Sequence, residues 1–258
     1  MLLKIIVSFF AGMGAGLGTG FAGLSAAAVI SPMLITFLDI PAYQAVGIAL
    51  ASDVLASAVS AYTYGKHKNL DLKNGTIMMA FVLLFTAVGS YVSSLVEATT
   101  MGTMSTVMTV FLGVKFIVKP VMTTKEGMES ALSKKQRIVR SIVGGAGIGF
   151  VCGFVGAGGG MMMLLVLTTV LGYELKTAVG TSVFIMTFTA LTGSVSHFAI
   201  DKGVADVETL IFCVISTFVW AQIAAKIANK ASAKTLNRIT GVILILTGAV
   251  TIAFKYLT

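Results

Sequence analysis

Charged residues are scarce in this sequence. Asp, Glu, Lys and Arg together make up 11% of its 258 residues, whereas they make up about 25% of an ordinary soluble domain. The chain therefore cannot cover a water-facing surface of normal size, which excludes a soluble globular enzyme. Because 57% of the residues are hydrophobic, a disordered chain is excluded as well. The apolar runs are continuous rather than alternating, which excludes an outer-membrane barrel and leaves a polytopic helical membrane protein.

Cysteines and acidic residues are also few. The two cysteines, Cys152 and Cys213, fall inside apolar segments, so the sequence supports no disulfide framework. Lys and Arg number 18 against 10 acidic residues, a net charge of +8. The basic residues lie in short stretches between apolar segments, where they indicate the orientation of the protein in a bilayer. The net positive charge therefore does not predict a nucleic-acid partner. No cofactor and no metal site are predicted either.

Two of the apolar stretches are longer than one membrane crossing, which takes about 20 residues. The stretches are 5–38, 42–64, 75–96, 100–118, 138–171, 175–199, 207–225 and 239–254. The first and fifth each carry a glycine cluster near the middle, where a backbone can turn sharply. We expect each to form a hairpin whose second arm is a short helix, near 26–38 and 159–171. The beginning of the chain has features of a signal peptide, but its apolar character continues to Leu38, so we keep it in the mature fold.

The glycine clusters belong to an internal repeat with an offset of 133 positions, the separation of Gly12 and Gly145. At this offset glycines 12, 14, 16, 20 and 23 coincide with glycines 145, 147, 149, 153 and 156, and Ala-Val-Gly at 45–47 coincides with Ala-Val-Gly at 178–180. The predicted units are a first transmembrane repeat at 1–118, a cytoplasmic linker at 119–137 and a second repeat at 138–258. Each repeat is predicted to contain a Gly-rich hairpin and three transmembrane helices.

The charges of equivalent loops indicate that the two repeats are inverted relative to each other. Lys68 coincides with Asp201, and Lys73 coincides with Asp206. With two hairpins, Lys4, Lys202 and Lys255 reach one face and the other 15 of the 18 basic residues reach the opposite face. Basic loops favour the cytoplasm, so both termini are predicted outside, in a multi-pass protein of the plasma membrane.

The two hairpin turns, GFAGLSAAAV at 20–29 and GFVGAGGGMM at 153–162, are candidates for a binding site. In lipid, irregular backbone survives only against protein or beside a polar cavity. Each short helix would start at a buried turn, with its free N–H groups and positive dipole end in the middle of the membrane. Two such ends entering from opposite faces would hold one small anion. Close helix packing is the favoured alternative for glycines 12, 14, 16, 145, 147 and 149.

The residues predicted to bind substrate are glycines and hydroxyl residues at or near these turns. They are Gly23, Ser25, Gly156, Gly158, Gly159, Gly160, Thr181 and Ser182. Three consecutive glycines are poor helix formers, which suits an open backbone. For Thr181 and Ser182, a hydrogen bond to a carbonyl of their own helix is an equally good interpretation.

Asp53 is the one acidic residue deep inside an apolar stretch. An intramembrane carboxylate is costly, so we interpret it as a group that takes a proton or meets a coupling cation, with a protonated packing residue as the alternative. His197 stands beside Asp201 at the end of a stretch, where a solvated histidine is the favoured interpretation over a proton relay.

The sequence resembles the TauE/SafE sulfite exporter family of small membrane transporters. The resemblance lies in GFVGAGGGMMML followed by LGYELKTAVGTSVF in the second half, and in GFAGLSAAAVISPML followed by LDIPAYQAVGIAL in the first. Residues 24–27, Leu-Ser-Ala-Ala, replace the further glycines that the family pattern has, and Ile48-Ala49 replaces Thr-Ser. The resemblance implies a secondary transporter, commonly a proton-coupled exporter, of sulfur-containing anions such as sulfite or organosulfonates. It assigns the substrate to Gly156, Gly158, Gly159, Gly160, Thr181 and Ser182.

Two other functions remain open. A passive anion channel would use the same site without alternating access. An intramembrane serine protease would use Ser25, in Gly-Leu-Ser-Ala, with His197 as base, although the final glycine of that motif is missing and the repeat offers no place for a lone Ser/His pair. The chain is otherwise predicted not to be an enzyme. Its expected partners are the anion and membrane lipid, and the oligomeric state is left open, with a homodimer as one option.

Overall fold

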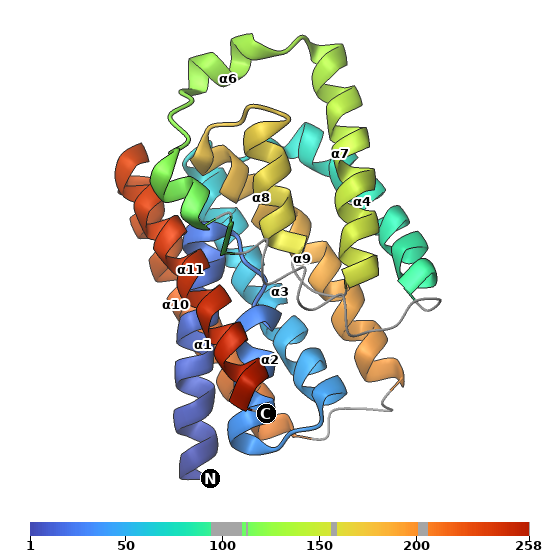
Figure 1. Cartoon of the computed structure of the whole chain (residues 1–258), viewed down its shortest axis with the longest axis vertical. Helices are drawn as coiled ribbons and strands as arrows, with labels where there is room; N and C mark the ends of the chain where they lie inside the picture. The colour runs from blue at the N-terminus through green and yellow to red at the C-terminus, as the bar shows by residue number, and fades with distance from the viewer. Residues whose placement is uncertain (94–109, 112, 156–158, 201–205, 258) are drawn as a thin grey trace.

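The structure is a computed structural model that describes residues 1–93, 110–111, 113–155, 159–200 and 206–257. Every regular element in these ranges is an α-helix (Figure 1). The labelled helices are α1 (Leu2–Ala22), α2 (Ala27–Leu38), α3 (Ala42–Lys66), α4 (Leu72–Ser93), α6 (Lys125–Ala131), α7 (Lys134–Val155), α8 (Gly159–Thr169), α9 (Leu175–Ile200), α10 (Val207–Lys230) and α11 (Ala233–Leu257). The all-α fold class is confirmed.

Four of the described helices are long and apolar enough to cross a membrane. The spans are Leu2–Ala22, Tyr43–Lys66, Leu175–Val195 and Val207–Lys230. Large apolar side chains such as Leu55, Leu84 and Ile215 are exposed on the outside of the bundle. So much exposed apolar surface suits lipid rather than water. The prediction of a polytopic helical membrane protein is therefore confirmed.

Two helices are only half the length of a membrane span. α2 has 12 residues and α8 has 11, so at 1.5 Å per residue they are about 18 and about 17 Å long, against about 30 Å of hydrocarbon. α1 begins at the lower end of Figure 1 and α2 turns back toward that end, whereas α7 begins at the upper end and α8 turns back toward it. Both helices begin within one residue of the expected positions. The repeat relation between the two halves stays a prediction.

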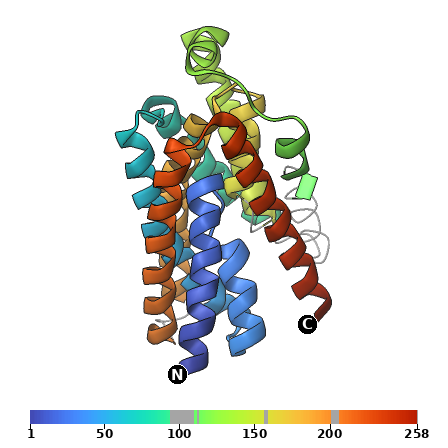
Figure 2. The same ribbon diagram turned by 90° about the vertical axis from the view of Figure 1, so that its left-hand side faces the viewer.

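The most extensive helix contacts pair a helix from the first half of the chain with a helix from the second half. α1 packs along α10, beside it in both views (Figures 1 and 2), and α4 packs along α7. A Cβ at Gly16 of α1 would lie 2.6 Å from the carbonyl oxygen of Thr217, and one at Gly145 of α7 would lie 2.7 Å from that of Met78. Gly12 and Gly149 are packed as tightly. The packing role expected of these four glycines is confirmed, because only a missing side chain lets the backbones approach so closely. At Gly147 the expectation is wrong, since a Cβ there would meet nothing within 4 Å in the described part of the chain.

An ion pair ties each of these helix pairs together near one end. Lys4 Nζ of α1 lies 2.7 Å from Oδ2 of Asp206, the N-cap of α10. Arg137 Nη1 of α7 lies 4.0 Å from Oδ2 of Asp71, which precedes α4. Lys4 and Arg137 are 133 positions apart, the offset of the sequence repeat. Because α1 and α7 begin at opposite ends of the molecule, the two ion pairs also lie at opposite ends.

The buried apolar core surrounds the first hairpin turn. One buried cluster includes Phe21 and Leu24 at this turn together with Tyr64 of α3, Val183 of α9 and Met163 of α8. The predicted linker contains α6, which lies beyond the upper end of the bundle. α7 starts at Lys134, inside the segment predicted as linker, and the repeat boundaries stay a prediction.

Candidate functional site

The first hairpin turns at Gly23, whose backbone is left-handed. Its φ is +61°, a conformation that glycine adopts without steric cost. The Gly23 N–H donates to the carbonyl of Thr19 at 2.9 Å, and the Leu24 N–H donates to that of Gly18 at 3.2 Å. These bonds end α1 in the way that a glycine C-cap ends many helices. The chain can then reverse and start α2 four residues later.

The carbonyl groups at the end of α1 point into the bundle, where no water is available to bind them. Four hydroxyl side chains from four different helices supply the missing donors. They are Tyr64 to Gly20 (2.9 Å), Thr240 to Phe21 (3.2 Å), Ser182 to Gly23 (3.3 Å) and Thr19 to Leu24 (2.8 Å). The hydroxyls thus hold an irregular turn in the interior at low cost, since each buried carbonyl has a partner.

The two hairpins touch each other at this turn. The carbonyl oxygen of Gly23 lies so close to Gly160, in the first turn of α8, that a Cβ at Gly160 would overlap it. Ser182 of α9 donates its hydroxyl to the same oxygen, and its Oγ would lie 2.6 Å from a Cβ at Gly23. Of the residues predicted to bind substrate, the structure therefore brings together Gly23, Gly160 and Ser182. Gly159 begins α8 beside them, and Gly156 and Gly158 lie outside the described residues.

Asp53 lies in the middle of α3 with 1% of its surface exposed. Its Oδ2 accepts a hydrogen bond from Ser25 of the first hairpin at 2.8 Å. The other oxygen, Oδ1, is buried and has no hydrogen-bond partner within the described part of the chain. The backbone N–H of Ala26 and the hydroxyl of Thr19 also face this carboxyl group. Asp53 therefore occupies the space next to the N-terminus of α2, where the sequence led us to expect substrate.

Ser25 and Thr181 have different surroundings from those expected of substrate ligands. The Ser25 hydroxyl binds Asp53 and also accepts weakly from the N–H of Ala27, at 3.4 Å. Thr181 is turned away from the hairpin tips, and its Oγ1 accepts from the backbone N–H of Asp71 at 3.2 Å. The side chain of His197, the other half of the hypothetical Ser/His pair, lies outside the described residues.

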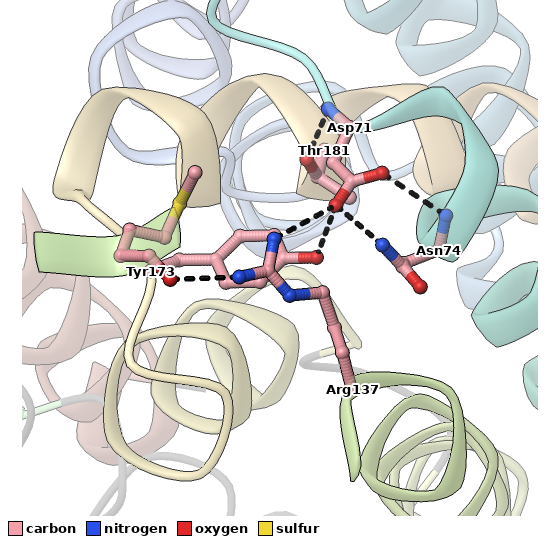
Figure 3. Close-up of polar contacts among 6 residues, drawn as sticks. Asp71, Asn74, Arg137, Tyr173 and Thr181 are labelled. Carbon is pink, nitrogen blue, oxygen red and sulfur yellow. Dashed lines mark hydrogen bonds and ion pairs between the residues drawn. The ribbon is translucent and has the colours of Figure 1, made fainter. Parts of the chain in front are cut away.

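Thr181 belongs to a polar cluster near the upper end of the bundle (Figure 3). Asp71 Oδ2 accepts from the Tyr173 hydroxyl at 2.7 Å and from Asn74 Nδ2 at 2.6 Å, and Oδ1 accepts from the Asn74 N–H at 3.0 Å. Arg137 completes the cluster through its ion pair with Asp71. Burial, assisted by the Asp71 charge, raises the pKa of Tyr173 well above its usual value, so this hydroxyl stays protonated and donates.

Comparison with known proteins agrees with this architecture. The model of the family described as "Sulfite exporter TauE/SafE" matches residues 8–251. The chain belongs to the TauE/SafE family. Two relatives from Bacillus subtilis (strain 168) are similar to it. The probable membrane transporter protein YdhB is 25% identical over 88% of this chain and 90% of its own length. The probable membrane transporter protein YunE is 25% identical over 90% of this chain and 89% of its own length. No solved structure matches.

This TauE/SafE chain is therefore a membrane transporter, as predicted. Among the described residues no group of three or more His, Cys, Asp or Glu side chains could hold a metal ion. Sequence reasoning missed Thr19, Tyr64 and Thr240, the hydroxyl donors around the first turn. The sequence did contain the general signal, because a helix that ends inside lipid leaves carbonyls that need donors.

Proposed function

We propose that the protein is a secondary active exporter of small sulfur-containing anions, such as sulfite or organosulfonates, and that Asp53 couples transport to protons. The observation that carries the proposal is the buried Asp53 carboxyl beside the turn at which the two hairpins meet. Its Oδ1 has no hydrogen-bond partner within the described residues. A buried carboxylate with an unsatisfied oxygen is costly, and a proton removes that cost.

The substrate anion binds, in this proposal, at the hairpin tips, with backbone N–H groups at the start of α8 as donors. Ser182, Gly23 and Gly160 line the place. Asp53 and Ser25 occupy the equivalent place at the start of α2 when Asp53 is ionised. Two negative charges in a low-dielectric interior repel each other strongly, so the anion binds when Asp53 carries a proton. Protonation also removes the negative charge facing the α2 N-terminus, so Gly23 and Ser25 join the substrate site.

Proton and anion then move together as one half of the bundle rocks against the other. A divalent anion that travels with one proton carries one net negative charge. An inside-negative membrane potential drives that charge outward with about 2.3 kcal/mol per 100 mV. The membrane potential therefore favours export of the anion. The basic residues favour an orientation in which the basic end of the molecule faces the cytoplasm and both termini lie outside the plasma membrane.

Purified protein in liposomes tests this proposal. Sulfite efflux should be accompanied by proton movement and should respond to a pH gradient. Asp53→Asn should still exchange labelled for unlabelled sulfite while losing the response to the gradient, because the amide mimics the protonated carboxyl but cannot release a proton. If no small sulfur oxyanion or sulfonate is transported by the wild type, the substrate assignment is wrong.

The same preparation separates a carrier from a channel. In a carrier, unlabelled sulfite on the far side accelerates the exchange of labelled sulfite, because the loaded site returns faster than the empty one. A channel would not respond in this way. A fluorophosphonate probe that labelled Ser25 would instead support the protease interpretation, which the bond from Ser25 to Asp53 does not favour.

A further inference from the structure

A cavity of about 330 Å³ opens beside the polar cluster at the upper end of the bundle. Asp71, Lys73, Asn74, Lys134 and Arg137 line it together with two aliphatic side chains. The cavity therefore combines three basic groups with one carboxylate. It lies between the start of α4 and the start of α7, which belong to different halves of the chain.

The single carboxylate in this cavity is already fully engaged. Asp71 accepts hydrogen bonds from Asn74 and Tyr173, and its ion pair with Arg137 adds a positive charge nearby. Arg137 in turn donates from Nη2 to the carbonyl of Met128 at 2.7 Å, which holds its guanidinium group in place over the Tyr173 ring. The negative charge of Asp71 is thus compensated within the cluster (Figure 3).

Two of the basic groups have no such compensation. Within the part of the chain that the structure describes, neither Lys73 nor Lys134 forms an ion pair. Both are exposed and border the same cavity from different helices. Two unpaired ammonium groups around one cavity create a positive potential that attracts anions.

One of the cavity residues, Asp71, is hydrogen-bonded to α9, the helix that also contacts the first hairpin turn. The N–H of Asp71 donates to Thr181, and the next residue, Ser182, donates to the Gly23 carbonyl at the tips. The Asp71 cluster therefore connects the cavity with the segment of α9 that contacts the first hairpin turn.

We propose that this cavity is a second anion site, a vestibule that takes a small oxyanion from the aqueous phase before it enters the transport site. Lys73 and Lys134 bind the anion, and Arg137, which stays beside Asp71 and bound to the Met128 carbonyl, adds a third positive charge at the cavity. This proposal extends the proposed function and depends on it for the identity of the bound anion. The same oxyanion chemistry is present in the headgroups of acidic lipids, and the experiment distinguishes the two sources.

Sulfite binding to the purified protein in a neutral detergent, measured by calorimetry without oxygen, tests the vestibule. The double variant Lys73→Gln/Lys134→Gln should weaken the salt-sensitive component of binding by about tenfold. Lys135→Gln is the matched control, since Lys135 is equally exposed on α7 but does not line the cavity. In oriented proteoliposomes the double variant should raise the KM for sulfite at this face by a similar factor and leave the maximal rate unchanged.

The proposal is overturned if the double variant binds sulfite as the wild type does. It is also overturned if sulfite binding in phosphatidylcholine nanodiscs is lost when phosphatidylglycerol is added, because the cavity would then bind lipid headgroups. Failure of the proposed function looks different. In that case no sulfur anion would be transported, while sulfite binding could still depend on Lys73 and Lys134. Conversely, sulfite transport with an unchanged KM in the double variant would support the proposed function and contradict the vestibule.

Discussion

The carbonyl oxygen of Gly23 lies directly against Gly160, with no room for a side chain between them. Gly23 ends α1 and Gly160 stands in the first turn of α8, so two hairpins from different halves of the chain meet backbone to backbone. A contact of this kind brings N–H groups of one hairpin close to the irregular backbone of the other. The shared anion site that we propose rests on this contact.

Gly160→Ala should disrupt this contact. The added methyl group would overlap backbone rather than a flexible side chain, so the hairpins must separate, at a cost of about 1–3 kcal/mol. We expect a lower thermal unfolding temperature in detergent and loss of sulfite transport. Gly147→Ala is the control, because a Cβ at that glycine of α7 would meet nothing within 4 Å. Equal stability of the two variants would show that the contact is not closely packed.

The Lys4–Asp206 ion pair should be separable from the helix cap that Asp206 also provides. Asp206 accepts from the Thr209 N–H at 3.1 Å and from Lys4 at 2.7 Å. Asp206→Asn keeps a capping oxygen but loses the ion pair, so we expect the free energy of unfolding to fall by about 0.5 kcal/mol. Asp206→Ala loses both, for about 1–2 kcal/mol. Chemical unfolding in detergent measures the difference, and equal losses for the two variants would contradict it.

The same pair predicts a dependence of stability on pH. Burial acts to raise the pKa of Asp206, but the hydrogen bonds from Lys4 and Thr209, with the Lys4 charge, together hold it below its usual value. A carboxyl whose pKa is lowered by folding stabilises the protein above its unfolded pKa of about 3.9 and loses that contribution as the pH falls through the folded value. The wild type should therefore be more stable to unfolding than Asp206→Asn at neutral pH, and this difference in stability should disappear only below about pH 4. A difference that persisted unchanged in stronger acid would contradict this assignment.

The hairpins could be predicted from the sequence because both signals are local: glycines mark where the backbone can turn, and segment length shows that a stretch exceeds one membrane crossing. The starts of the short helices followed from the position of the turns, and the burial of Asp53 followed from its place in an apolar stretch. The partner of Asp53 could not be predicted in this way. Ser25 is a substrate candidate from the hairpin sequence alone, and its bond to Asp53 depends on the packing of α3 against the hairpin in the folded chain.

Thr181 illustrates a different limit. Thr181 and Ser182 are both predicted to bind substrate, as hydroxyl residues near the second turn, but consecutive residues of an α-helix point about 100° apart. The two therefore face different surroundings, Asp71 for one and Gly23 for the other. The crosswise ion pairs were missed for a similar reason. The offset of 133 aligned Lys4 with Arg137, but the partner of each comes from the other half of the chain.

Tyr173→Phe should weaken the polar cluster at the upper end. It removes one donor to Asp71, a bond of 2.7 Å to a charged acceptor, and leaves the buried ring in place. Hydrogen bonds to charged groups contribute about 1.5–3 kcal/mol, and we expect a loss near the lower limit because Arg137 and Asn74 remain. Thermal unfolding of the purified protein gives the size of the loss. Tyr62→Phe, at an exposed tyrosine of α3, is the control and should change nothing.

Removing each of the two neighbouring hydroxyls of α9 should affect stability similarly but transport differently. Ser182→Ala removes the donor to the Gly23 carbonyl, so we expect a higher KM for sulfite, together with a stability loss of about 1 kcal/mol. Thr181→Val keeps the shape of the side chain but leaves the Asp71 N–H without its acceptor, so we expect a comparable loss of stability while the hairpin tips and the KM for sulfite stay intact. The decisive measurement is the KM of both variants in the same proteoliposomes. A KM that rose in Thr181→Val and not in Ser182→Ala would place the substrate beside Asp71 and away from the hairpin tips, because each hydroxyl contacts only one of these two places.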